Sequence, residues 1–192
     1  QIEEQAQGVS LMPEGLVDAL TDDEIASLVR FLSELGRTPE YTLSKQRLVR
    51  SWLVMQATPE GIHQLNRTSF SKVATDDPAF TFVPRYSEVS GALPLAAMPQ
   101  MRVREQDVSF ARCQLNVTTP GQIGFRVNSA EGLEVRIDGV PTPPQAEFSS
   151  SLSGGLHTVT VTVNQGLRKV PLILEVVAGS GQPQGNAELV NQ

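Results

Sequence analysis

The stretch from Ala111 to Val177 limits the fold of this chain more than any other feature, because apolar and polar residues alternate along it in short runs. The runs with this period of two lie at 111–117, 123–127, 133–137, 158–163 and 172–176. Such alternation places all apolar side chains of a strand on one face of a sheet. Glycine-containing turn dipeptides separate the runs: Pro120-Gly121, Asp138-Gly139 and Gly154-Gly155. We therefore predict an antiparallel β-sandwich built from a meander of strands.

The alternation also predicts which side chains of the sandwich are buried. The residues expected in the core are Val135, Ile137, Val159 and Val161. The residues expected to be largely exposed on the opposite face are Arg136, Thr160 and Thr162. Trp52 has apolar neighbours on both sides and is expected in the core rather than as a platform for a sugar ring.

A short amphipathic helix is predicted near the N-terminus, over Asp22–Leu35. Thr21 and Glu24 have the spacing of a capping box, in which each side chain bonds the backbone amide of the other residue. An apolar stripe follows at helical spacing and consists of Ile25, Leu28, Val29, Leu32 and Leu35. Because a helix of this length is marginal alone, its stripe is expected to cover the β-region or a segment upstream.

The rest of the chain divides into a β-domain and a tail. We expect residues 1–40 to be a helical segment, 41–178 the β-sandwich domain and 179–192 a flexible tail rich in glycine, glutamine and asparagine. Within the β-domain we expect a strand over Leu48–Met55, a short helix over Thr58–Arg67 and a strand near Phe80 and Phe82. The predicted fold class is mainly β, with a small N-terminal α-helical segment.

Charge is concentrated at the N-terminal end of the chain. Residues 1–40 hold nine acidic and two basic side chains, whereas the whole chain of 192 residues has a net charge of −6. An acidic head beside a nearly neutral β-region makes nucleic-acid binding an unfavoured function. No apolar run approaches the roughly 20 residues of a membrane span. The chain starts at Gln1 without a signal peptide, so we expect it to be a fragment or a processed product.

The reactive residue types do not assemble into a catalytic motif. Cys113 is the single cysteine, which excludes an internal disulfide and a CxxC metal site, and its strand position predicts a buried thiol. The two histidines, His63 and His157, have no nearby nucleophile motif, and the chain has neither a phosphate-binding glycine loop nor HExxH. Catalysis by this segment alone is not expected.

The N-terminal segment resembles the end of a class I c-type cytochrome domain. The resemblance covers residues 1–36 and lies in Ser10-Leu11-Met12-Pro13-Glu14-Gly15-Leu16, followed by the capped helix that opens Leu20-Thr21-Asp22-Asp23-Glu24-Ile25. It is closest to the haem-binding domains of large secreted planctomycete proteins. The resemblance implies that Met12 is an axial ligand of haem iron, that the last helix packs over haem c, and that the protein is periplasmic or secreted. The CxxCH attachment motif is absent here, so the resemblance places it, with the proximal histidine, upstream.

The β-region resembles a second family, the protective-antigen-type β-sandwich. The resemblance covers residues 112–176 and depends on the strand that ends in Asp138-Gly139 and on the later Gly155-Leu156-His157. Some members of that family bind carbohydrate, often through calcium held by neighbouring aspartates. Asp138 has no adjacent aspartate, so the resemblance does not extend to a calcium site.

Two residues of this match have alternative roles. Asp138 is interpreted first as a type I′ turn residue and second as a ligand contact. His157 is interpreted first as a residue that bonds nearby backbone at the start of a strand, and second as a metal or sugar contact. His63 is expected at the surface of the short helix.

Three functions remain open from the sequence. In the first, the chain is the C-terminal part of a secreted electron-transfer cytochrome that has a redox partner protein. In the second, the β-sandwich is a carbohydrate- or surface-binding module. In the third, the sandwich is a structural spacer in a larger oxidoreductase.

Overall fold

The computed structural model describes residues 18, 20–34, 37, 46–75 and 77–190. The chain divides into two compact units, Gln1–Leu43 and Ser44–Gln192. The boundary between these units lies three residues after the boundary predicted between residues 40 and 41.

The first unit contains the predicted helix as α1 (Asp22–Glu34). The Glu24 amide donates to the Thr21 hydroxyl at 3.4 Å, and the Thr21 amide donates to the Glu24 carboxylate at 2.8 Å. The capping box is therefore confirmed. The Glu24 carboxylate accepts hydrogen bonds from the Thr21 amide and the Thr21 hydroxyl, and these two bonds lower the pKa of Glu24. No described residue of α1 is buried, and Leu28, Val29 and Leu32 of its apolar stripe are exposed.

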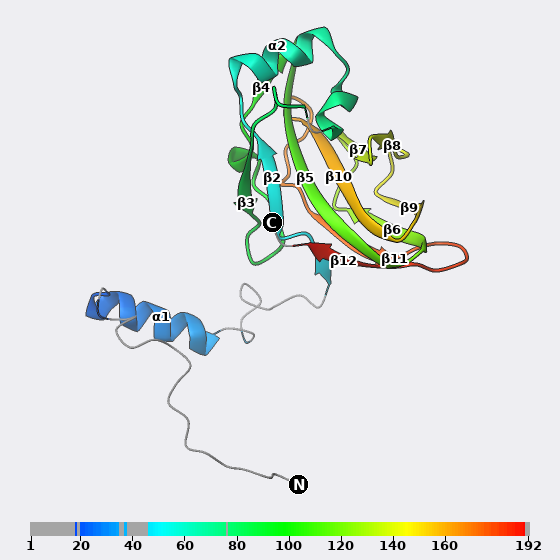
Figure 1. Ribbon diagram of the computed structural model, residues 1–192. Helices are drawn as coiled ribbons and strands as arrows, with labels where there is room; N and C mark the ends of the chain where they lie inside the picture. Colours follow the sequence, from blue (N-terminus) through cyan, green and yellow to red (C-terminus); the bar gives the residue numbers. More distant parts are fainter. Residues whose placement is uncertain (1–17, 19, 35–36, 38–45, 76, 191–192) are drawn as a thin grey trace. The chain divides into compact units, whose positions relative to one another are not determined.

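Two antiparallel sheets form the second unit, as the alternation predicted (Figure 1). The smaller sheet has the strand order β1-β11-β6-β9. Its strands are β1 (Arg47–Leu48), β11 (Leu174–Ala178), β6 (Gly121–Val127) and β9 (Glu147–Leu152). Strand β9 forms one outer edge of this sheet, which matters for the site described below.

The larger sheet has the order β3-β2-β5-β10-β7-β8, with two further strands paired to β5. Its strands are β3 (Phe82–Tyr86), β2 (Ser51–Met55), β5 (Gln106–Thr119), β10 (Gly155–Asn164), β7 (Leu133–Ile137) and β8 (Val140–Pro141). The two further strands are β4 (Met101–Val103) and β12 (Asn186–Val190). The long strands β5 and β10 pair along their whole shared length and form the centre of the sheet (Figure 1).

The main core lies between the two sheets and confirms the predicted inward residues. Val135, Ile137, Val159 and Val161 are all buried in one cluster. Trp52 is fully buried, and its indole N–H donates to the Ser87 hydroxyl at 3.0 Å. These side chains come from the larger sheet, and the smaller sheet adds Ile123, Phe125, Leu174 and Val176 to the same cluster. The alternation therefore correctly identified which face of each strand points into the core between the sheets.

Cys113 lies in the same core, as predicted. Burial raises the pKa of its thiol to about 12. Because the thiolate is the reactive form, this cysteine is inert at neutral pH.

The predicted meander is wrong, because strands that follow each other in sequence lie in different sheets. Strands β5, β7 and β10 belong to the larger sheet, whereas β6, β9 and β11 belong to the smaller one. The chain crosses from one sheet to the other at almost every turn of this region. A period of two fixes which face of a strand is buried, but the choice of pairing partner depends on long-range packing.

The predicted exposure of Arg136, Thr160 and Thr162 is also wrong, since all three are buried. The outer face of the larger sheet is covered by α2 (Pro59–Arg67) and the 3₁₀ helix η2 (Phe70–Ala74). These helices complete a second apolar cluster on that face, which consists of Met55, Leu65, Val73, Phe80, Met101, Val103, Val108 and Phe110. The sequence predicted the helix α2 but gave no sign that it would cover this face.

Arg112 of β5 connects the end of η2 to the larger sheet. Its guanidinium donates to the Thr75 carbonyl at 2.6 Å and lies over the Phe82 ring, 4.1 Å from the ring centroid. The cation–π contact adds to the hydrogen bond because the group is desolvated.

The C-terminal segment differs from the flexible tail that we predicted. Residues Asn186–Val190 form β12, which pairs with β5, and Ala187 is buried. Composition did not predict β12, because residues 179–186 have low hydropathy. The burial of this strand depends on Ala187 and on the partly buried Leu189. None of the described helices is long and apolar enough to cross a bilayer.

Residues 84–101 contain the end of β3 and the short 3₁₀ helix η3 (Leu95–Ala97). Strand β5 begins after Arg104 and Glu105, which both have a positive φ.

Candidate binding cleft

A cleft of about 470 Å³ opens along one side of the sandwich, where the outer strands of the two sheets lie opposite each other. Strand β9 of the smaller sheet forms one wall. The hairpin of β7 and β8 in the larger sheet forms the other wall, with Val140, Pro141 and Pro143. Both walls are sheet edges, so the cleft is a direct consequence of the strand order.

Serine side chains make up most of the β9 wall. Ser149, Ser150, Ser151 and Ser153 all line the cleft, together with the buried Leu152. Alternation along β9 places Ser150 on the same face as Phe148 and Leu152, which point into the core. Ser149 is engaged elsewhere, because its hydroxyl contacts Ser180 at 3.0 Å. The wall therefore offers small polar groups that leave room for a ligand.

Asp138 stands at the turn between β7 and β8. Its φ of 49° and the φ of 80° at Gly139 are the left-handed angles of a type I′ turn. The Asp138 carboxylate accepts a hydrogen bond from the Thr158 amide at 2.9 Å, and the Asp138 amide donates to the Thr158 carbonyl at 2.9 Å. The predicted role of Asp138 as a turn residue is thus confirmed, and its carboxylate also fixes the start of β10.

His157 closes one end of the cleft and contacts both walls. Its Nδ1 lies 2.6 Å from the Asp138 carboxylate, and its Nε2 lies 2.9 Å from the Ser153 carbonyl. The predicted backbone bond of His157 is confirmed, whereas its contact with Asp138, 19 residues away, was not foreseen. Burial lowers the pKa of His157, but its hydrogen bonds to Asp138 and Ser153 and the charge of Asp138 outweigh burial and raise it overall.

The hydrogen bonds of His157 limit the chemistry that its ring can perform. Both ring nitrogens of His157 are occupied, so neither is directed at a serine hydroxyl as a general base requires. Among the described residues no group of three or more His, Cys, Asp or Glu side chains is placed to hold a metal ion. The cleft is lined by several hydroxyl groups and one carboxylate, a surface suited to hydrogen-bonding a polar ligand.

The other candidate residues lie outside the cleft. Met12 is outside the described residues, so the structure does not test it as a haem ligand. His63 is exposed on α2, as expected. Trp52 belongs to the core and is not available as a sugar-stacking platform.

The serines of β9 were missed by the sequence analysis. Their signal was the run from Ser149 to Ser153 directly before Gly154-Gly155 and His157. Serine runs are common in loops, and only the strand order shows that this one faces a hairpin from another sheet.

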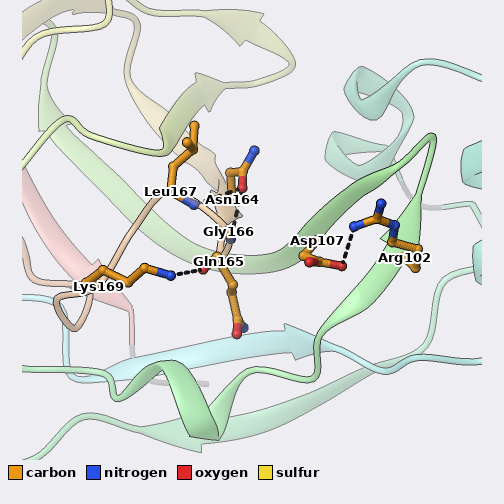
Figure 2. A network of polar contacts seen from close by, with 7 residues as sticks. All are labelled: Arg102, Asp107, Asn164, Gln165, Gly166, Leu167 and Lys169. Atoms are coloured by element: carbon orange, nitrogen blue, oxygen red, sulfur yellow. Dashed lines mark hydrogen bonds and ion pairs between the residues drawn. The ribbon is translucent and has the colours of Figure 1, made fainter.

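A second polar network holds the loop after β10 (Figure 2). The Asn164 side chain accepts hydrogen bonds from the amides of Gly166 and Leu167, at 3.0 and 3.3 Å. Lys169 donates to the Gln165 carbonyl at 3.3 Å. These contacts are short-range and use exposed groups, so we interpret the network as support for the loop.

Comparisons of the chain with models of protein families, with curated proteins and with solved structures find no match.

Proposed function

We propose that the β-sandwich unit is a carbohydrate-binding module of an extracytoplasmic protein, with the cleft between β9 and the β7–β8 hairpin as its binding site. The observation that carries this proposal is that the serines of β9 and the carboxylate of Asp138 line the same cleft. The loose sequence resemblance to a family with carbohydrate-binding members supports the same ligand class.

The chemistry of the cleft suits a sugar. Serine hydroxyls both donate and accept hydrogen bonds, as sugar hydroxyls do, so the two can pair in either direction. The side chain of Asp138 is 47% exposed, and its oxygens retain lone pairs for a ligand hydroxyl. The rings of Pro141 and Pro143 add apolar surface for the C–H face of a sugar ring.

A glycan array probed with the full chain tests this proposal. We expect binding to a subset of oligosaccharides, and we expect the double substitution Ser150→Ala and Ser151→Ala to weaken that binding. Loss of two hydrogen bonds at about 1 kcal/mol each corresponds to roughly thirtyfold in affinity. The control is Ser33→Ala, which removes an exposed hydroxyl from α1 and is expected to leave binding unchanged. An array without any bound glycan, or a double variant that binds normally, contradicts the proposal.

We propose as a second function that the N-terminal unit is the end of a haem-binding electron-transfer domain. The specific observation in its favour is α1, a capped helix whose apolar residues Leu28, Val29 and Leu32 are exposed. A helix that covers a cofactor needs such a stripe, and its charged residues remain available to steer a basic redox partner. In this proposal Met12 supplies the axial thioether and haem c is attached by a segment upstream. Methionine ligation favours electron transfer and raises the reduction potential.

The full-length parent protein, matured with its haem, tests this second function. Met12→Ala is expected to lower the midpoint potential, because it removes the thioether ligand. Leu11→Ala keeps that ligand and is expected to change the potential much less. A parent protein without haem, or an unchanged potential in Met12→Ala, contradicts the cytochrome proposal and leaves the binding module as the function.

A further inference from the structure

His157 joins the two turns that close one end of the cleft. The Asp138 carboxylate belongs to the turn between β7 and β8, and the Ser153 carbonyl belongs to the turn between β9 and β10. The imidazole therefore bridges the two opposing walls. It also stands at the end of the inward row that continues with Val159, Val161 and Val163, so its ring is held by the core behind it.

Both partners of the ring are hydrogen-bond acceptors. A carboxylate and a carbonyl oxygen each require an N–H group, and only the imidazolium carries N–H on both nitrogens. The neutral ring has one N–H, so it satisfies one partner and turns a lone pair toward the other. The bridge across the cleft is thus complete in one protonation state only.

The bond to Asp138 is the one that the neutral ring keeps. A charged acceptor forms the stronger hydrogen bond, and Asp138 is additionally fixed by the Thr158 amide. The bond to the Ser153 carbonyl is then lost, and that carbonyl is left facing a lone pair. The released turn contains Gly154 and Gly155, and Gly155 has a φ of 119° with nothing within 4 Å of its missing Cβ. This turn has both backbone freedom and space to move.

We propose that His157 is a pH-sensitive staple of the cleft: as an imidazolium it holds the β9–β10 turn against the β7–β8 turn, and loss of its proton releases the Ser153 side of the cleft. The consequence for ligand binding rests on the proposed carbohydrate function, but the staple itself does not.

Asp138 is the charged side chain that lies next to His157. Among the described residues that line the cleft, Asp138 is the only other ionisable one. The neighbouring strands contribute apolar side chains, with Leu152 from β9, Ile137 from β7 and Leu115 opposite His157 on β5.

The sign of the pH dependence follows from the raised pKa of His157. A histidine with a higher pKa in the folded state stabilises the fold fully below the unfolded value of about 6.5, and this contribution is lost as pH rises through the folded value. The cleft is therefore stapled in mildly acidic solution and released in alkaline solution.

Titration of the full chain by NMR, from about pH 5 to about pH 9, tests the staple without any ligand. We expect the His157 ring to titrate with a midpoint above about 6.5, with both ring nitrogens protonated below it. The backbone amides of Ser153, Gly154 and Gly155 are expected to shift with the same midpoint. A ring with one protonated nitrogen throughout, or turn amides that do not follow the ring, overturns the proposal.

Two substitutions separate the staple from other titrations. Asp138→Asn removes the negative charge and is expected to lower the His157 midpoint, while Asn retains an oxygen for the Thr158 amide. His157→Gln is expected to abolish the pH-dependent shifts of the turn amides. The control is His63→Gln, which replaces the exposed histidine on α2 and is expected to leave those shifts unchanged. Turn shifts that persist in His157→Gln overturn the proposal, and if either cleft variant fails to fold, the titration of the unmodified chain still decides.

A binding arm distinguishes this inference from the proposed function. An oligosaccharide identified on the array is expected to bind with different affinities at about pH 5 and about pH 9 in the unmodified chain, and with equal affinities in His157→Gln. A chain that binds no glycan refutes the carbohydrate function, whereas the NMR titration alone decides the staple.

Discussion

At the scale of single residues, Arg168 is a buried charged side chain that connects two loops of the sandwich. It is fully buried, and burial lowers the pKa of its guanidinium. One nitrogen donates to the carbonyls of Ser129 and Glu131, at 2.8 and 3.1 Å. The other donates to the Asn128 side chain at 2.6 Å and to the Pro171 carbonyl at 2.9 Å. One side chain thereby joins the loop after β6 to the loop before β11.

We expect Arg168→Ala to lower the free energy of unfolding by about 3 kcal/mol, because it leaves buried carbonyl groups without a donor. Chemical denaturation with urea measures this change. The matched control is Lys169→Ala in the same loop, where the side chain is exposed and the expected change is within about 0.5 kcal/mol. Equal stabilities of the two variants would show that the Arg168 contacts contribute nothing.

Residue roles were predictable from the sequence where they depend on neighbours in the chain. The turn at Asp138 follows from its glycine partner, the burial of Cys113 follows from strand alternation, and the burial of Trp52 follows from its apolar neighbours in the sequence. The contact between Asp138 and His157 did not follow, because it depends on β7 and β10 being adjacent in the larger sheet. Arg168 gave no signal at all, since arginine is usually exposed and its burial requires acceptors from distant loops.

At the scale of elements, β12 is a short strand that the composition of its sequence does not predict. It pairs with β5 beside β1, and Arg47 of β1 donates to the Asn186 side chain at 3.2 Å and to the Ala187 carbonyl at 3.1 Å. Local sequence predicted the long strands because each carries three or more inward apolar residues. It did not predict β12, β4 or the packing of α2 on the larger sheet. These features depend on strand edges and apolar surface that the long strands leave uncovered.

Truncation tests the contribution of β12 to stability. A chain that ends at Gly185 loses the strand and uncovers part of β5 beside Leu115. We expect a loss of about 2 kcal/mol from the exposed apolar surface and the unpaired ladder, which corresponds to roughly 4–8 °C in melting temperature at this chain length. The control ends at Val190 and keeps β12, so we expect it to melt with the full chain. A truncated chain that also melts with the full chain would contradict this role of β12.

At the scale of the whole molecule, the two units have different sources of stability. The sandwich has two apolar clusters and sheet pairings that join residues far apart in sequence. The first unit contributes one described helix with no buried residue. A helix of this length in water is marginal without a packing partner. The sandwich is therefore expected to fold independently, and α1 is the less stable element.

Limited proteolysis tests this independence. We expect trypsin to cleave first at Arg37 or Lys45, at the boundary between the compact units Gln1–Leu43 and Ser44–Gln192. The large fragment is expected to accumulate, because most of its arginine and lysine residues lie in strands and helices, which open only with global unfolding. A recombinant chain of residues 44–192 is then expected to melt within about 2 °C of the full chain, since less than about 1 kcal/mol is lost. A fragment that does not accumulate, or an unfolded chain of residues 44–192, would show that the sandwich depends on the N-terminal unit. That unit would then have a structural role that neither the haem proposal nor the carbohydrate proposal requires.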